Sequence, residues 1–217
     1  MYTVSVNAII IDFDGTIADS FEHVLEFLLS QAGRRLEDVT PEERQQLKGL
    51  SMKDLALKVG IPSWRLPLVY FRGKAVMAKR MHATPMFDGV QELLARLNDE
   101  QYQMYIMSSN SRRNINRFLA EHGLGGYFKR VYGNAGWFGK GPALKKALKQ
   151  NGLQAATTVY VGDEVRDLIG AQYAGMPSIA VSWGFGSEEQ LLRYKPTILA
   201  RSPAELQKAL IDWGQTY

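Results

Sequence analysis

The sequence contains no cysteine, only three histidines and no long uninterrupted run of apolar residues. The lack of cysteine excludes disulfides, cysteine-ligated metals and a cysteine nucleophile, and it is compatible with the cytoplasm. No stretch approaches the roughly 20 apolar residues of a membrane span. A signal peptide is not expected either, because the N-terminus has no basic segment and Asp12 and Asp14 interrupt its apolar run.

The chain also lacks a strong excess of either charge. Its 217 residues carry a formal net charge of +4, and 46% of them are hydrophobic, which suffices for one large domain or one domain with an insertion. Lysine and arginine are scattered and not interleaved with aromatic residues, so we expect neither a nucleic-acid nor a membrane partner. A small anionic substrate suits the mild positive charge, and we expect a cytoplasmic monomer or homodimer.

Short β-branched runs alternate with helical patterns, which is typical of a parallel sheet covered by helices on both faces. We therefore predict an α/β fold with a Rossmann-like core. Helices are predicted over Pro142–Gln150 and Val165–Ala174. The predicted strands are Val4–Ile11, Tyr102–Met107, Lys129–Tyr132, Thr158–Val161, Ser178–Val181 and Thr197–Leu199.

The segment over residues 20–83 interrupts this alternation with helical patterns only. An apolar stripe at helical spacing opens it, formed by Phe21, Val24, Leu25 and Leu28. We predict that residues 20–83 form an all-helical cap domain inserted after the first strand. Residues 1–19 and 84–217 would then form the Rossmann-like core.

Two carboxylates follow the first predicted strand directly. Asp12 and Asp14 are two residues apart, a spacing that puts both on the same side of an extended chain. Clustered carboxylates repel unless a cation lies between them, which suggests Mg²⁺, a hard ion that takes oxygen ligands. Gly15 permits a sharp turn with amides facing a phosphate. Alternatively, the acids and the glycine serve only as turn residues.

Two later segments add groups suited to a phosphate. Ser108 ends an apolar strand and leads into a helix, where it could donate a hydrogen bond to a phosphate oxygen or merely cap the helix. Ser109, beside it, is a cap in the simpler interpretation. Lys140 lies just before a helix, and a lone lysine there is usually solvated. Lys140 is a candidate site residue only because of its place in the order of these motifs along the chain.

A second acidic cluster follows the predicted strand at Thr158–Val161. Asp163 and Asp167 are four residues apart across a helix start, so both can point at one cation, and Glu164 lies between them. Acids at a helix N-terminus can instead interact only with the helix dipole. Parallel sheets bind ligands at the carboxyl ends of their strands, so we expect the two acidic clusters to meet.

In order and approximate spacing, these motifs resemble those of the haloacid dehalogenase superfamily. Residues 12–17 (Asp-Phe-Asp-Gly-Thr-Ile) match the first signature, Ser108 the second, Lys140 the third, and Asp163 with Asp167 the fourth. The resemblance extends over essentially the whole chain. The helical insertion and the Gly-Met-Pro-Ser-Ile-Ala-Val-Ser-Trp-Gly stretch over residues 175–184 are similar to the phosphoglycolate phosphatase-like group.

The resemblance implies a Mg²⁺-dependent phosphatase for a small phosphomonoester. Asp12 would attack phosphorus, and Asp14 would act as general acid and then general base. Mg²⁺ would bind Asp12, the Asp14 carbonyl and Asp163, while Lys140, Ser108 and Ser109 would contact the substrate.

Three further residues have implied supporting roles. Asp167 would orient Lys140 or a metal-bound water. Glu164 replaces the small or neutral residue of many relatives, so which acid contacts the ion is left open. Lys53 matches a stretch that faces the active site in relatives and could bind a substrate carboxylate, or it could be a solvated helix lysine.

Three other functions share parts of this pattern. A phosphomutase would share every catalytic residue, so the motifs do not separate it from a phosphatase. A dehalogenase would need neither Asp14 nor a metal. A non-enzymatic receiver-like domain also holds Mg²⁺ and an acceptor aspartate, but there the acidic pair precedes the acceptor, and no cap is present.

Overall fold

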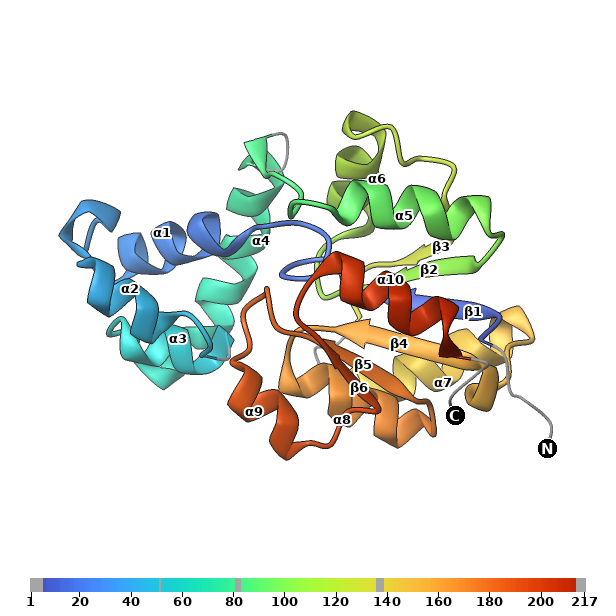
Figure 1. The fold of residues 1–217 in the computed structure, drawn as a ribbon. Coiled ribbons are helices and arrows are strands. Elements are labelled where there is room, and N and C mark those ends of the chain that lie inside the picture. Colours follow the sequence, from blue (N-terminus) through green and yellow to red (C-terminus); the bar gives the residue numbers. More distant parts are fainter. Residues whose placement is uncertain (1–5, 51, 81–82, 136–138, 214–217) are drawn as a thin grey trace.

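The computed structural model describes residues 6–50, 52–80, 83–135 and 139–213. Within them, six parallel strands form one sheet in the order β3-β2-β1-β4-β5-β6 (Figure 1). The strands are β1 (Ala8–Ile11), β2 (Gln103–Met107), β3 (Phe128–Tyr132), β4 (Thr158–Gly162), β5 (Ser178–Val181) and β6 (Ile198–Ala200). The predicted α/β fold with a parallel sheet is confirmed.

Helices cover both faces of the sheet, with α5 and α10 on one face and α7 and α8 on the other (Figure 1). They are α5 (Val90–Asp99), α6 (Arg112–Glu121), α7 (Lys140–Asn151), α8 (Val165–Ala174), α9 (Glu188–Arg193) and α10 (Pro203–Ile211). Strand β1 is apolar throughout because its side chains are buried on both faces of the sheet. Ile9 and Ile11 pack into the hydrophobic cluster on one face, and Ala8 and Ile10 into the cluster on the other.

Between β1 and α5, the described residues contain four α-helices that lie together to one side of the sheet (Figure 1). They are α1 (Phe21–Gln31), α2 (Pro41–Leu47), α3 (Met52–Lys58) and α4 (Leu66–Arg80). They enclose a second hydrophobic cluster of their own. The predicted stripe on α1 is buried in it: Phe21, Val24, Leu25 and Leu28. Burying a side chain of this size contributes ~1.5–3 kcal/mol.

Two predicted boundaries differ from the structure by more than one residue, and the other strand and helix ends agree to within one. Strand β1 begins at Ala8 and not at Val4, although residues 4 and 5 lie outside the described residues. Helix α7 begins at Lys140, two residues before the predicted start at Pro142. Proline is tolerated in the first turn of a helix, so Pro142 does not have to be the first helical residue. Helix α8 has the predicted bounds. None of the helices in the described ranges combines the length and hydrophobicity that crossing a membrane requires.

Candidate active site

The centre of the sheet is the point at which the strand order reverses. From β1 the chain continues outward to β2 and β3 on one side, and from β4 to β5 and β6 on the other. Ligands of such sheets bind in the crevice beyond the carboxyl ends of the strands at this reversal. Asp12 follows β1 and Asp163 follows β4, and the Asp12 amide donates to the Val161 carbonyl at 2.8 Å. The fold therefore brings the two acidic clusters together, as expected.

Three buried carboxylates form the centre of the site. Each of Asp12, Asp163 and Asp167 offers an oxygen within 4.8 Å of the others, and none is more than 1% exposed. Burial raises the pKa of Asp12 from 3.8 to about 7, although the nearby Lys140 lowers it. Burial, with the charge of Glu164, raises the pKa of Asp163 well above 3.8. A hard divalent cation would offset this concentration of negative charge, so the residues fit Mg²⁺.

Lys140 lies between two of these acids. Its Nζ is 2.6 Å from Asp12 Oδ2 and 2.5 Å from Asp167 Oδ1, and it donates to the Tyr160 hydroxyl at 3.0 Å. Burial alone would lower its pKa, but the charges of Asp12 and Asp167 raise it above 10.5. The side chain is 1% exposed. Lys140 is therefore a fixed buried cation and not a solvated lysine.

Asp14 points to a different set of partners. Its Oδ1 accepts from Ser20 Oγ at 3.0 Å, its Oδ2 accepts from Asn110 Nδ2 at 3.1 Å, and Ser108 Oγ lies 3.5 Å from Oδ2. Its side chain is not a member of the three-carboxylate cluster. Burial raises its pKa, and the hydrogen bonds from Asn110 and Ser20 lower it. The carboxyl is thus held by neutral donors, which suits a group that exchanges a proton.

Backbone and hydroxyl donors hold Asp163. Thr16 Oγ1 donates to its Oδ1 at 2.7 Å, and the Phe185 amide donates to its Oδ2 at 2.8 Å. Gly15 has φ +81°, and a Cβ there would overlap Asp163 Oδ2. Glycine is therefore required both for the turn and for the close approach of the aspartate.

Glu164 and Asp167, the two acids that follow Asp163 in the sequence, have different partners. The Glu164 carboxylate pairs with Arg166, whose Nε lies 2.5 Å from Oε2. Asp167 instead joins the three-carboxylate cluster, while its Oδ2 accepts from the Glu164 amide at 3.0 Å. Of the two side chains, that of Asp167 belongs to the cluster with Asp12 and Asp163, while the charge of Glu164 acts on Asp163 from outside the cluster.

A cavity of about 910 Å³ opens beside Asp14, between helices α1, α3 and α4 and the segments that follow β1, β2 and β4. Asp14, Ser109, Asn110 and Arg166 line its floor, and the exposed Lys53 on α3 lines its opposite side. Its other walls are largely apolar, including Val24, Phe27, Leu28, Met52, Leu66, Val69 and Met77. Ser108 lies just beneath, buried, with its Oγ accepting from the Asn110 amide at 3.0 Å.

Sequence reasoning did not find Ser20, Asn110, Arg166 or Phe185. Asn110 had the clearest signal, because it lies two residues after Ser108 at the end of β2. Phe185 had a weaker one, as it follows β5, whose carboxyl end meets the same edge of the sheet. Nothing in the local sequence indicates that Ser20 reaches back to Asp14.

Comparisons with known proteins found a matching family model and several relatives. The model of the haloacid dehalogenase-like hydrolases matches residues 9–181. A phosphoglycolate phosphatase of Synechococcus elongatus is 32% identical over 206 residues, covering 94% of this chain and 97% of that protein. A 5'-nucleotidase of Pseudomonas aeruginosa is 29% identical over 133 residues, or 60% of each chain. The solved structure of a haloacid dehalogenase-like hydrolase of Streptococcus pneumoniae has a TM-score of 0.77 at 21% identity, covering 94% of this chain and 97% of that one.

Proposed function

The chain belongs to the haloacid dehalogenase-like hydrolases, and from this premise we propose that it is a Mg²⁺-dependent phosphatase that forms an aspartyl-phosphate on Asp12. The observation that carries the proposal is the setting of Asp12. Its carboxylate lies at the reversal point of the sheet, 2.6 Å from a buried ammonium and beside two further carboxylates. This combination suits a nucleophile that must meet an anionic phosphate.

In the first half-reaction, a carboxylate oxygen of Asp12 attacks phosphorus and the phosphorus–oxygen bond to the leaving group breaks. The leaving alkoxide takes a proton from Asp14, whose raised pKa favours the protonated form needed for this step. Mg²⁺ held by Asp12, Asp163 and the Asp14 carbonyl would screen the phosphate charge.

In the second half-reaction, Asp14 takes a proton from a water molecule as the water oxygen attacks phosphorus. The phosphorus–oxygen bond to Asp12 breaks, which releases phosphate and restores the carboxylate. Ser20 and Asn110 hold Asp14 on the cavity side of Asp12 in both steps. We assign Lys140 and Ser108, with Ser109 beside them, to the phosphoryl oxygens, while Asp167 orients Lys140.

We further propose that residues 20–83 act as a cap domain that closes over the cavity, and that the substrate is small and carries a carboxylate, as 2-phosphoglycolate does. The name of the Synechococcus elongatus relative supports this substrate class, and so does Lys53, a cation that lines the same cavity as Asp14. Closure would also exclude competing water.

The test is phosphate release from a panel of phosphomonoesters, including 2-phosphoglycolate and nucleoside monophosphates, with Mg²⁺ or with excess chelator. We expect turnover to require the metal and 2-phosphoglycolate to be hydrolysed faster than nucleotides. Asp12→Asn is the control, and it should be inactive because an amide cannot form the acyl phosphate. Full activity in chelator would contradict the metal requirement, and a tenfold preference for nucleotides would contradict the substrate class.

A further inference from the structure

The segment over residues 183–186, between β5 and α9, wraps around Asp163. The Phe185 amide donates to Asp163 Oδ2 at 2.8 Å, and the Gly186 amide donates to the Asp163 carbonyl at 3.1 Å. Trp183 Nε1 donates to the Thr16 carbonyl at 3.1 Å, and the Thr16 hydroxyl in turn holds Asp163 Oδ1. The segment therefore fixes both oxygens of one carboxylate, directly and through Thr16.

The fit of this segment is tight. A Cβ at Gly184 would overlap the Asp163 carboxylate and the Gly15 carbonyl, and a Cβ at Gly186 would overlap the Asp163 carbonyl. Because the backbone packs directly against Asp163, a shift of the 183–186 backbone toward this residue would displace its carboxylate.

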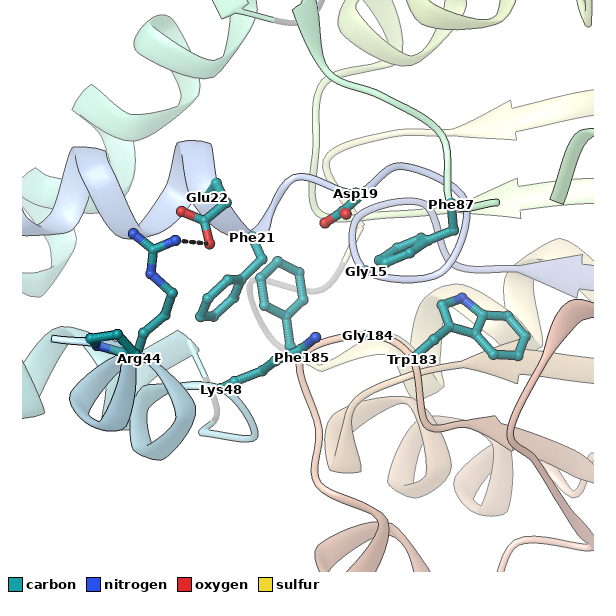
Figure 2. Close-up of a pocket in the computed structure, with 11 residues that line it drawn as sticks. Gly15, Asp19, Phe21, Glu22, Arg44, Lys48, Phe87, Trp183, Gly184 and Phe185 are labelled. Carbon is teal, nitrogen blue, oxygen red and sulfur yellow. Dashed lines mark ion pairs between the residues drawn. The ribbon is translucent and has the colours of Figure 1, made fainter. Parts of the chain in front are cut away.

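The side chain of Phe185 points the other way, into the helical segment. It is 2% exposed and belongs to the hydrophobic cluster of α1 to α4, not to that of the sheet. Its ring lies 5.7 Å from the ring of Phe21, the first residue of α1 (Figure 2). The backbone of Gly186 also forms an isolated β-bridge with Gly49, between α2 and α3. One residue thus joins the Asp163 carboxylate to the core of the helical segment.

We infer that Phe185 is a positioning residue that couples the packing of the helices at residues 20–83 to the placement of Asp163, and thereby to Mg²⁺ affinity. The inference rests on the proposed function, because Asp163 is a metal ligand only in that proposal. Coupling of this kind is reciprocal: if the helices improve metal binding through Phe185, bound metal must stabilise the packed position of the helices by the same factor.

The test is Mg²⁺ binding by isothermal titration calorimetry, which does not depend on turnover. Phe185→Leu keeps the amide donor but loses ring contact with Phe21, and we expect its dissociation constant to rise about tenfold, as for other residues that support metal ligands. Phe21→Leu should raise the constant several-fold although it lies in the helical segment. It should have no further effect when combined with Phe185→Leu, because both changes break the same link.

Leu29→Val is the matched control. Leu29 is buried in the same cluster, eight residues along α1 from Phe21, or about 12 Å at 1.5 Å per residue. Its dissociation constant should stay within about twofold of the wild-type value. Equal weakening by Leu29→Val, or wild-type affinity in both phenylalanine variants, would overturn the inference. If Phe185→Leu does not fold, Phe21→Leu alone decides.

Asp163→Asn separates this inference from the proposed function. If Asp163→Asn binds Mg²⁺ as the wild type does, the proposed metal site is wrong. If it loses Mg²⁺ while the phenylalanine variants do not, only the coupling is wrong. Hydrogen–deuterium exchange provides the reciprocal readout: Mg²⁺ should slow exchange in α1 of the wild type and have a smaller effect in Phe21→Leu. An equal effect in both proteins would overturn the coupling.

Discussion

Replacing Lys140 with methionine tests how the buried charges of the site balance. Methionine keeps most of the volume but removes the ammonium that lies 2.6 Å from Asp12 and 2.5 Å from Asp167. Removing one partner of a buried ion pair typically destabilises a protein by about 3–5 kcal/mol, because the remaining charge is left uncompensated. We expect a loss of this size in the free energy of unfolding of Lys140→Met at about pH 8, without metal.

The loss should depend on pH in a direction fixed by Asp12. Burial raises its folded-state pKa from 3.8 to about 7, so the folded state binds the proton more tightly than the unfolded state does. The stabilisation that this proton on Asp12 provides is therefore fully present below about pH 4 and is lost as the pH rises through 7. The loss is about 4 kcal/mol, since each unit of the pKa shift corresponds to about 1.4 kcal/mol. Without Lys140 the pKa of Asp12 rises further, so charged Asp12 destabilises the variant more than the wild type at about pH 8. At about pH 5.5 Asp12 is protonated in both proteins and adds nothing to the difference, which leaves the loss of the Asp167 partner.

Urea denaturation of both proteins at about pH 5.5 and about pH 8, in excess chelator, measures the difference. The destabilisation of Lys140→Met should be clearly smaller at the lower pH, where Asp12 is protonated in both proteins. The raised pKa of Lys140 itself lies outside this range, so its own titration does not contribute. A loss of the same size at both pH values, or no loss at either, would refute this charge balance.

Two further predictions concern the metal and the substrate. The rise in melting temperature produced by excess MgCl₂ should be large at about pH 8 and small at about pH 5.5. The reason is that protons compete with the metal for Asp12 and Asp163, whose pKa values are raised. A thermal-shift series in which the Mg²⁺ effect does not change with pH would contradict this prediction. Lys53→Ala should raise KM for a carboxylate-bearing phosphoester while sparing p-nitrophenyl phosphate, and steady-state kinetics showing equal losses on both would indicate a structural role.

Much of the fold could be predicted because its signals are local. Strands β2, β4 and β5 are apolar runs, and α8 has a glycine in the left-handed conformation just after its last residue, at Gly175. The start of α7 was harder to predict. Proline indicated a start at Pro142, whereas the helix begins at Lys140, whose side chain contacts Asp12 just after β1. That contact is tertiary and leaves no trace in the local sequence.

The candidate site shows the same limit. Order along the chain and the rule for strand ends were enough to bring Asp12, Lys140, Asp163 and Asp167 together. The orientation of each carboxylate depends on donors that lie far away in sequence, such as Phe185 for Asp163, and sequence patterns do not report them. The assignment of catalytic roles to these residues stays a prediction.

The central claim, that Asp12 accepts the phosphoryl group and Asp14 handles the proton, is tested most directly by Asp14→Asn with p-nitrophenyl phosphate. This phenolate leaves without protonation, so Asp12 should be phosphorylated quickly, whereas asparagine cannot activate the water that removes the phosphate. We predict a burst of p-nitrophenol close to one equivalent of enzyme, followed by slow turnover, with mass spectrometry finding the phosphoryl group on Asp12. A folded, Mg²⁺-binding variant that shows neither burst nor adduct, or an adduct on another residue, would contradict the mechanism.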